Sequence, residues 1–184
     1  MLHRCTGTLL SAISGKSKAS LNTRAPTSGN DFYANLIWID GRKCLLVTHA
    51  GSLFSIFAAD VRVGDLRPIG KFVVPMIEDA LRAEGLPTDT FGHLDAVDVE
   101  LAKTASRSVL GCMNDLALHC EFAALDAGGV LLLDVARLND DIHRTILGPL
   151  GSSCPVEVAA QLAATNSGPS SQPLLRLVRE HEQR

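Results

Sequence analysis

The chain has 184 residues, of which 46% are hydrophobic, so it is long enough to bury a core and short enough to form one domain. Its formal net charge of -3 argues against a surface that coats nucleic acid generally, although a local basic patch is compatible with it. Any binding of a polyanion is therefore expected to be local.

The five cysteines are scattered without a Cys-x-x-Cys pair, and an odd number cannot close entirely into intrachain disulfides. This pattern favours a reducing compartment, and we expect a cytoplasmic protein. The run MLHRCTGTLLSAISGKSK contains only short apolar stretches broken by Gly and Ser, so neither a secretory signal nor a membrane span fits it. Because this run lacks acidic residues, an organelle-targeting peptide remains an alternative.

The first elements are short. Residues 2–6 predict a strand and residues 8–13 a helix, and a polar loop is expected over residues 17–30.

A hairpin is predicted next. Residues 33–39 and 43–48 are rich in aromatic and branched side chains and flank Asp40 and Gly41, a dipeptide that accommodates the positive φ angles of a tight turn. Residues 52–58 continue the apolar character as either a third strand or a short helix, because periodicity does not decide over so few residues.

Residues 65–84 predict a helix, with Asp65 as a candidate cap and apolar residues at helical spacing. Gly85 ends it. Pro75 removes one helical hydrogen bond, so we expect a kink or a second segment there. Polar and apolar residues alternate over residues 95–101, as is typical of a half-buried strand.

A long helix follows over residues 108–125, with Ser106 or Ser108 as its cap. At about 100° per residue, one arc of this helix is apolar and is expected to face the core. This arc consists of Val109, Met113, Leu116, Cys120 and Ala124. A second arc carries Ser108, Cys112, Asp115 and His119 beside it, and we expect Cys112 to be a small core residue.

The run LNDDIHRTILGP indicates a further helix, with Asn139 as its cap and Gly148-Pro149 at its end. Residues 156–164 favour another helix. Residues 165–184 are interpreted as a linker and a charged tail, with a terminal helix over residues 174–184.

The start of the long helix is the leading candidate site. Lys103 and Arg107 lie just before or within its first turn, beside the hydroxyl groups of Thr104, Ser106 and Ser108. Free backbone N–H groups and the helix dipole attract anions at such a position. The sequence therefore predicts a phosphate or carboxylate site, and the alternative is simple capping beside two solvated cations.

Asp115 and His119 are candidate catalytic residues, because a spacing of four brings two side chains together on one helix face. The alternative is a structural hydrogen bond. Cys112 lies roughly 10 Å from His119 along the axis, too far for a cysteine–histidine dyad. A metal site would need His49 to converge with this pair, and no ligand spacing supports it, so we expect no metal and no cofactor.

Two motifs, YANLIWIDGRKCLLVTHAGSLFS and KTASRSVLGCMNDLAL, resemble those of an uncharacterised family of small bacterial proteins, a domain of unknown function. The likeness spans residues 1–164 and implies an intracellular bacterial protein with a shared site, without a known reaction. By position, it points to Tyr33, Asn35, Arg42, Lys43, Lys103, Thr104, Arg107, Ser108, Gly111, Asn114 and Asp115. The chain departs from the expected pattern at Ser106, where Asn is expected, and at Cys112, where Ser is expected.

We therefore expect one α+β domain over residues 1–164, in which a small, mainly antiparallel sheet packs against several helices. The leading hypothesis is a binding or regulatory module that holds an anionic ligand or a protein partner, and no membrane partner is expected. The ligand-binding candidates are Lys103, Thr104, Arg107, Ser108 and Asn114. The alternative is a hydrolytic or nuclease-like enzyme that uses Asp115 and His119 as acid and base and Arg107 to stabilise charge.

Overall fold

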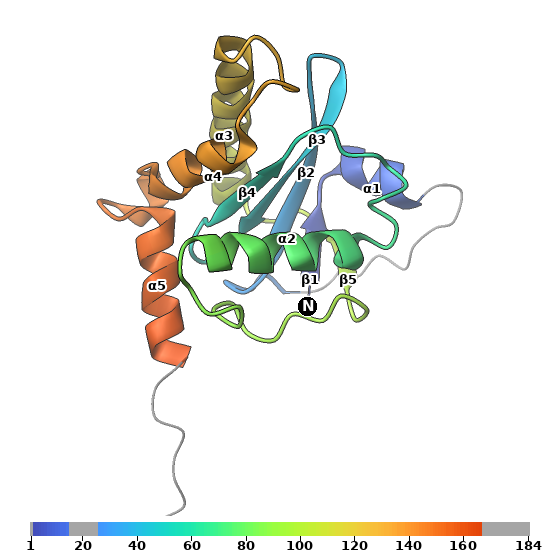
Figure 1. Ribbon diagram of the computed structural model, residues 1–184. Coiled ribbons are helices and arrows are strands. Elements are labelled where there is room, and N and C mark those ends of the chain that lie inside the picture. The colour runs from blue at the N-terminus through green and yellow to red at the C-terminus, as the bar shows by residue number, and fades with distance from the viewer. Residues whose placement is uncertain (1, 15–25, 167–184) are drawn as a thin grey trace, which may run out of the picture.

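The computed structural model describes residues 2–14 and 26–166 (Figure 1). It contains a five-stranded sheet in the order β4-β3-β2-β1-β5, with helices on both faces. The strands are β1 (Leu2–Cys5), β2 (Phe32–Ile39), β3 (Arg42–His49), β4 (Ser55–Ala58) and β5 (Glu100–Lys103). The helices are α1 (Gly7–Ser14), α2 (Ile69–Ala83), α3 (Arg107–Asp126), α4 (Val135–Arg144) and α5 (Pro155–Asn166), with a short 3-10 helix η1 (Gly148–Leu150). The predicted α+β class is confirmed.

The predicted hairpin is formed by β2 and β3, which pair antiparallel from Phe32 opposite His49 to Ile39 opposite Arg42. Asp40 and Gly41 have φ angles of 51° and 72°, so both turn residues adopt the left-handed region that the dipeptide predicts. β4 pairs antiparallel with β3, so the strand alternative is confirmed for the end of the 52–58 segment.

The sheet is mixed, because β1 pairs parallel with both β2 and β5. The expected antiparallel pairing therefore holds only for β2, β3 and β4. The predicted strand over residues 95–101 is wrong at its start: the Asp95 carboxylate accepts the N–H groups of Val97 and Asp98, which makes a turn, and the strand begins only at Glu100.

Each face of the sheet has its own core. Leu9 of α1 and Val73 of α2 pack with Ala34 and Val47 on one face, together with Ala159 of α5. α3 and α4 pack on the opposite face of the sheet. Figure 1 shows α2 in front of the sheet and α3 behind it. All five residues of the predicted apolar arc of α3 are buried, and Cys112 is buried with them. The arc prediction is therefore confirmed.

Two helix starts differ from expectation. α2 begins at Ile69, after Pro68, rather than at Asp65, and it continues through Pro75. Pro75 is exposed, so the carbonyl group that loses its helical partner lies where water can bind it. α4 begins after Asp134, whose side chain accepts the Arg137 N–H group, so the expected cap at Asn139 is wrong.

All five cysteines are free thiols, and four of them are buried. Within the described residues, no helix combines the length and apolar content that crossing a membrane requires. The tail prediction from residue 167 onward, and most of the predicted 17–30 loop, fall outside the described residues.

Candidate functional site

The carboxyl ends of β1 and β5 form a switch point in the sheet. The two strands are parallel neighbours, with Cys5 opposite Lys103. The helix that follows β1 packs on one face of the sheet, and the helix that follows β5 packs on the other. The N-terminal ends of α1 and α3 therefore both lie at the carboxyl ends of these two strands, a region that we call the β1–β5 edge. When the helices after two neighbouring parallel strands of an open sheet pack on opposite faces, ligands typically bind in a crevice outside the carboxyl ends of those strands.

Buried contacts hold this edge in place. The Arg4 side chain is 3% exposed, pairs with Asp31 at 2.6 Å and donates to the Lys103 carbonyl oxygen at 3.2 Å. The Tyr33 hydroxyl accepts the Ser106 N–H group at 3.1 Å. These contacts fix the end of β5 and the connection to α3, so the first turn of α3 starts from a rigid base.

The cap of α3 is Ser106, whose Oγ accepts the Val109 N–H group at 3.3 Å. Ser108, the alternative cap, lies inside the helix and is exposed. The N–H groups of Arg107 and Ser108 have no intrahelical acceptor, because they belong to the first turn. Lys103 and Arg107 are exposed, Thr104 is half-buried, and within the described residues neither cation forms a salt bridge.

The other predicted site residues lie farther along α3. Asn114, Asp115 and His119 are exposed. At 1.5 Å per residue they lie roughly 10, 12 and 18 Å from Arg107 along the helix axis. The structure therefore groups Lys103, Thr104, Arg107 and Ser108 at one edge and does not bring the Asp115–His119 pair to it.

His49 does not open onto a cleft. Its side chain is fully buried, its Nδ1 lies 2.9 Å from the Ser52 Oγ, and its ring stacks on Phe91 with 4.0 Å between centroids. Within the described residues, no group of three histidine, cysteine or carboxylate side chains is placed to hold a metal ion.

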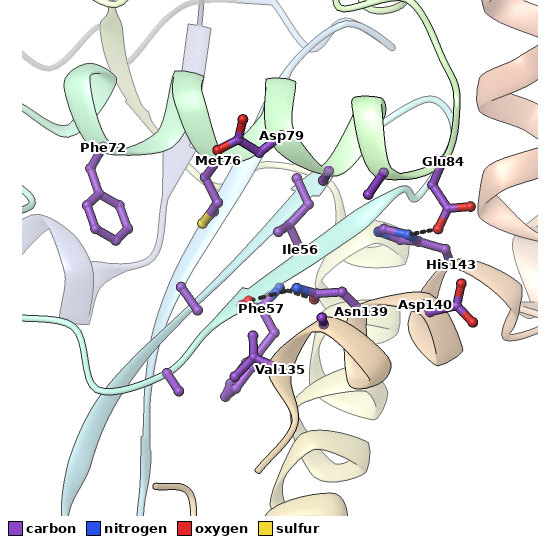
Figure 2. A pocket seen from close by; sticks show the side chains of 15 residues that line it. Ile56, Phe57, Phe72, Met76, Asp79, Glu84, Val135, Asn139, Asp140 and His143 are labelled. Atoms are coloured by element: carbon purple, nitrogen blue, oxygen red, sulfur yellow. Dashed lines mark hydrogen bonds and ion pairs between the residues drawn. The ribbon is translucent and has the colours of Figure 1, made fainter. Parts of the chain in front are cut away.

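A second candidate site is a groove of about 660 Å³ between α2 and α4, floored by β4 (Figure 2). Most of its lining is apolar, including Ile56 and Phe57 from the floor, Phe72 and Met76 from α2, and Val135 from α4. Its volume lies in the range of small-molecule pockets, which typically combine an apolar lining with a few polar groups. We call it the α2–α4 groove.

The polar end of the α2–α4 groove is a cluster of Glu84, His143 and Arg144. Glu84 Oε1 lies 2.7 Å from His143 Nδ1, and Arg144 donates to both oxygens at 3.1 and 3.0 Å. Burial opposes the charge of Glu84, but these hydrogen bonds outweigh it and lower the pKa of the carboxyl group. Burial lowers the pKa of His143, against the effect of Glu84. The ring is therefore neutral near pH 7, with its N–H on Nδ1 and facing Glu84.

Asn139 closes the edge of the sheet inside the α2–α4 groove. Its side-chain oxygen accepts the Phe57 N–H group at 2.8 Å, and its nitrogen donates to the Phe57 carbonyl oxygen at 3.1 Å. β4 is one of the two edge strands of the sheet, and this pair of bonds occupies backbone groups that would otherwise be open to another strand. The edge is therefore covered by α4 rather than left for strand addition.

Sequence reasoning did not identify the α2–α4 groove, since its polar residues come from the end of α2 and from α4, which are separated by about sixty positions. The only local signal was the polar face of LNDDIHR, where Asn139 and His143 are four residues apart and so share one side of a helix. That spacing places both side chains together but does not indicate what they face.

Comparisons with known proteins give a family and no activity. No curated protein sequence matches the chain. One family model, described as a domain of unknown function (DUF6933), matches residues 2–158, which cover all five strands and helices α1 to α4. The match includes both the β1–β5 edge and the α2–α4 groove. The chain therefore belongs to the family of the domain of unknown function DUF6933.

Proposed function

We propose that the protein is a binding module that holds an anionic group, a phosphate or a carboxylate, at the edge formed by the carboxyl ends of β1 and β5. The observation that carries this proposal is the switch point, where two parallel neighbours send their helices to opposite faces. Two helix N-termini meet there, and each offers free N–H groups and the positive end of its dipole.

The side chains at this edge suit an anion. Lys103 and Arg107 are exposed cations without a salt bridge to another described residue. The Thr6 hydroxyl donates to Asn35 at 2.9 Å, which leaves the Asn35 amide nitrogen as a further donor at the same edge. Thr104 and Ser108 add hydroxyl groups on either side of the cap. Asn114 lies roughly 10 Å along α3 from Arg107, so it would contact a larger ligand rather than the anionic group.

Calorimetry with inorganic phosphate, pyrophosphate and malonate tests the proposal. The parent protein should bind at least one of these probes, and the Lys103→Ala/Arg107→Ala double variant should bind it at least about tenfold more weakly. A matched control is Arg62→Ala/Lys71→Ala, which removes two exposed cations elsewhere and should leave the affinity unchanged. The double variant should also show a shallower dependence on salt, because fewer charges are screened.

Three results would count against the anion site. The parent could fail to bind any of the probes, or both double variants could weaken binding equally, in which case the effect reflects net charge. The Lys103→Ala/Arg107→Ala variant could also unfold, and the cations would then be structural. Exposed charge substitutions usually change the free energy of unfolding by no more than about 0.5 kcal/mol, so we expect its thermal midpoint to match that of the control.

A second candidate function is binding of a small apolar ligand in the α2–α4 groove, favoured by its volume of about 660 Å³ and its apolar lining. Met76→Arg should block this groove, because Met76 lies on its α2 wall (Figure 2) and is not part of the buried core of α2. A naphthalene probe whose fluorescence rises on binding should respond to the parent and not to this variant. Pyrophosphate affinity should be the same in both proteins.

Among the residues that the structure describes, no contact of Asp115 or His119 favours the hydrolytic alternative. His119→Ala tests it directly: a binding module keeps its affinity for pyrophosphate, whereas an enzyme loses turnover of pyrophosphate or of a phosphate ester.

A further inference from the structure

The outer face of α3 is apolar at its C-terminal half, which is unusual for a helix whose inner face already covers a sheet. Leu118, Phe122 and Leu125 are 51%, 57% and 71% exposed. Their spacing of four and three residues places them on one stripe, opposite the buried arc that packs on the sheet. No described segment of the chain covers this stripe.

The stripe continues into the loop after α3. Leu131 and Leu132 are 60% and 71% exposed. Together these five side chains offer on the order of 500 Å² of apolar surface, which matches the largest apolar patch of a typical monomer, and such a patch is often functional. We call the five residues Leu118, Phe122, Leu125, Leu131 and Leu132 the α3 patch.

A shallow groove adjoins the α3 patch. It has a volume of about 590 Å³ and lies between the loop over residues 128–132 and the tip of the β2–β3 hairpin, where Asp40 and Arg42 line it. Asp40 accepts the Val130 N–H group at 2.7 Å and so ties the loop to the hairpin. In Figure 1 the end of α3 and the hairpin tip lie at the same end of the molecule. Leu125, Leu131 and Leu132 belong to both the α3 patch and the lining of the groove, so the apolar stripe runs directly into the groove.

We propose that the α3 patch is the interface of a two-fold symmetric homodimer, in which Phe122 and Leu125 of each copy enter the groove of the other. A two-fold interface must be complementary to itself, because the same surface contributes both sides. The α3 patch meets this requirement, since it carries the ridge and the adjoining groove together.

Charges fit the same arrangement. Exposed acidic residues Glu121 and Asp126 lie on either side of the stripe. The groove is lined by one cation, Arg42, and by Asp40, whose carboxylate accepts the Val130 N–H group. When the ridge of one copy enters the groove of the other, its two carboxylates approach Arg42 of the second copy. Arg42 is 44% exposed and pairs with Asp60 at 3.0 Å, so part of its guanidinium remains available. Opposite charges thus meet around an apolar centre, as in many specific interfaces.

The size also fits a second copy. Stable interfaces bury about 800 Å² per partner, with an apolar centre and a polar rim. The α3 patch supplies the apolar centre, on the order of 500 Å² of that area, and the acidic residues and the hairpin tip supply the rim. The patch begins at Leu118, eleven residues and roughly 16 Å from Arg107 along α3, so the dimer would leave the anion-binding edge free.

Sedimentation velocity over a range of about 1–200 µM protein tests the dimer. The parent should shift from monomer to dimer with concentration, and Phe122→Asp should weaken association at least about 100-fold, because each dimer carries two copies of the substitution. The matched control is Ile146→Asp, which places the same charge at a side chain that is 67% exposed and lies outside the patch. It should dimerise as the parent does.

A charge exchange keeps the test independent of the apolar variant. Arg42→Glu should weaken the dimer, and adding Glu121→Arg and Asp126→Arg to the same chain should restore it. Helix content from circular dichroism should be unchanged in every variant, since all substituted residues are exposed. Any of four results would overturn the proposal. The parent could be monomeric throughout the range, or the dimer could tolerate Phe122→Asp. Phe122→Asp and Ile146→Asp could weaken association equally, or the charge exchange could fail to restore it.

Discussion

Acid should destabilise the protein through two histidines buried in its core. His3 and His49 are fully buried and lie on either side of Phe32, with centroid distances of 5.7 and 5.1 Å. Within the described part of the chain, neither ring nitrogen of His3 has a hydrogen-bond partner, and in His49 only Nδ1 has one. Burial lowers the pKa of each ring from 6.5 to about 4. Both rings are therefore neutral in the folded protein at pH 7.

The sign and size of the effect follow from proton uptake. As the pH falls below 6.5 the unfolded chain binds protons at these histidines before the folded protein does, so the free energy of unfolding decreases until about pH 4. One pKa unit corresponds to about 1.4 kcal/mol, so at about pH 4.5 each histidine should have cost roughly 2 kcal/mol of stability. Glu84 acts in the same direction. Its pKa is lower in the folded protein than in the unfolded chain, so the free energy of unfolding also decreases as the pH decreases.

Urea unfolding at a series of pH values between about 7 and 4.5 measures this loss, and the variant His3→Phe isolates one histidine. His3→Phe keeps an aromatic ring against Phe32 and has no group to protonate, so it should lose roughly 2 kcal/mol less than the parent over this range. His93→Gln is the control for the loss of a histidine at the surface, since His93 is exposed. If the parent and His3→Phe lost stability in parallel, the reasoning about burial would be refuted.

Four further outcomes are expected. Asn139→Ala should lower the free energy of unfolding by about 1–3 kcal/mol in urea, because it leaves the Phe57 N–H and C=O groups without partners. Gly41→Val should lower the unfolding midpoint, because a β-branched residue is strained at a φ of 72°. Ser106→Ala should cost about 1 kcal/mol, whereas Ser108→Ala should fall within about 0.5 kcal/mol of the parent. Thiol titration should find five free cysteines in denatured protein and slow reaction at the four buried ones in native protein.

Local signals predicted the elements whose structure depends on neighbouring residues. The hairpin follows from Asp40 and Gly41, whose positive φ angles the structure confirms. The buried arc of α3 follows from helical periodicity alone. The site at the start of α3 was proposed from residue types, and the structure adds what the sequence could not supply, namely that α1 begins at the same edge of the sheet.

Features that depend on distant contacts were missed. The parallel pairing of β1 with β5 joins residues that are nearly a hundred positions apart, as in Cys5 opposite Lys103, and leaves no local pattern. Asn139 is a residue type that often caps helices, but here its side chain forms two hydrogen bonds with the backbone of Phe57 in the edge strand. Asp134 caps α4 instead. Asp95 was predicted to lie in a strand because it fits the alternation of polar and apolar residues. That alternation does not reveal that its carboxylate accepts the N–H groups of Val97 and Asp98 and forms a turn.

We propose that an anion binds where α1 and α3 begin. Amide chemical shifts during a titration with inorganic pyrophosphate test it most directly, since free N–H groups in the first turns are the proposed donors. The largest shifts should occur at residues 7–9 and 106–109 and should disappear in the Lys103→Ala/Arg107→Ala variant. Shifts centred on Phe57 and α4, or no shifts at all, would contradict it.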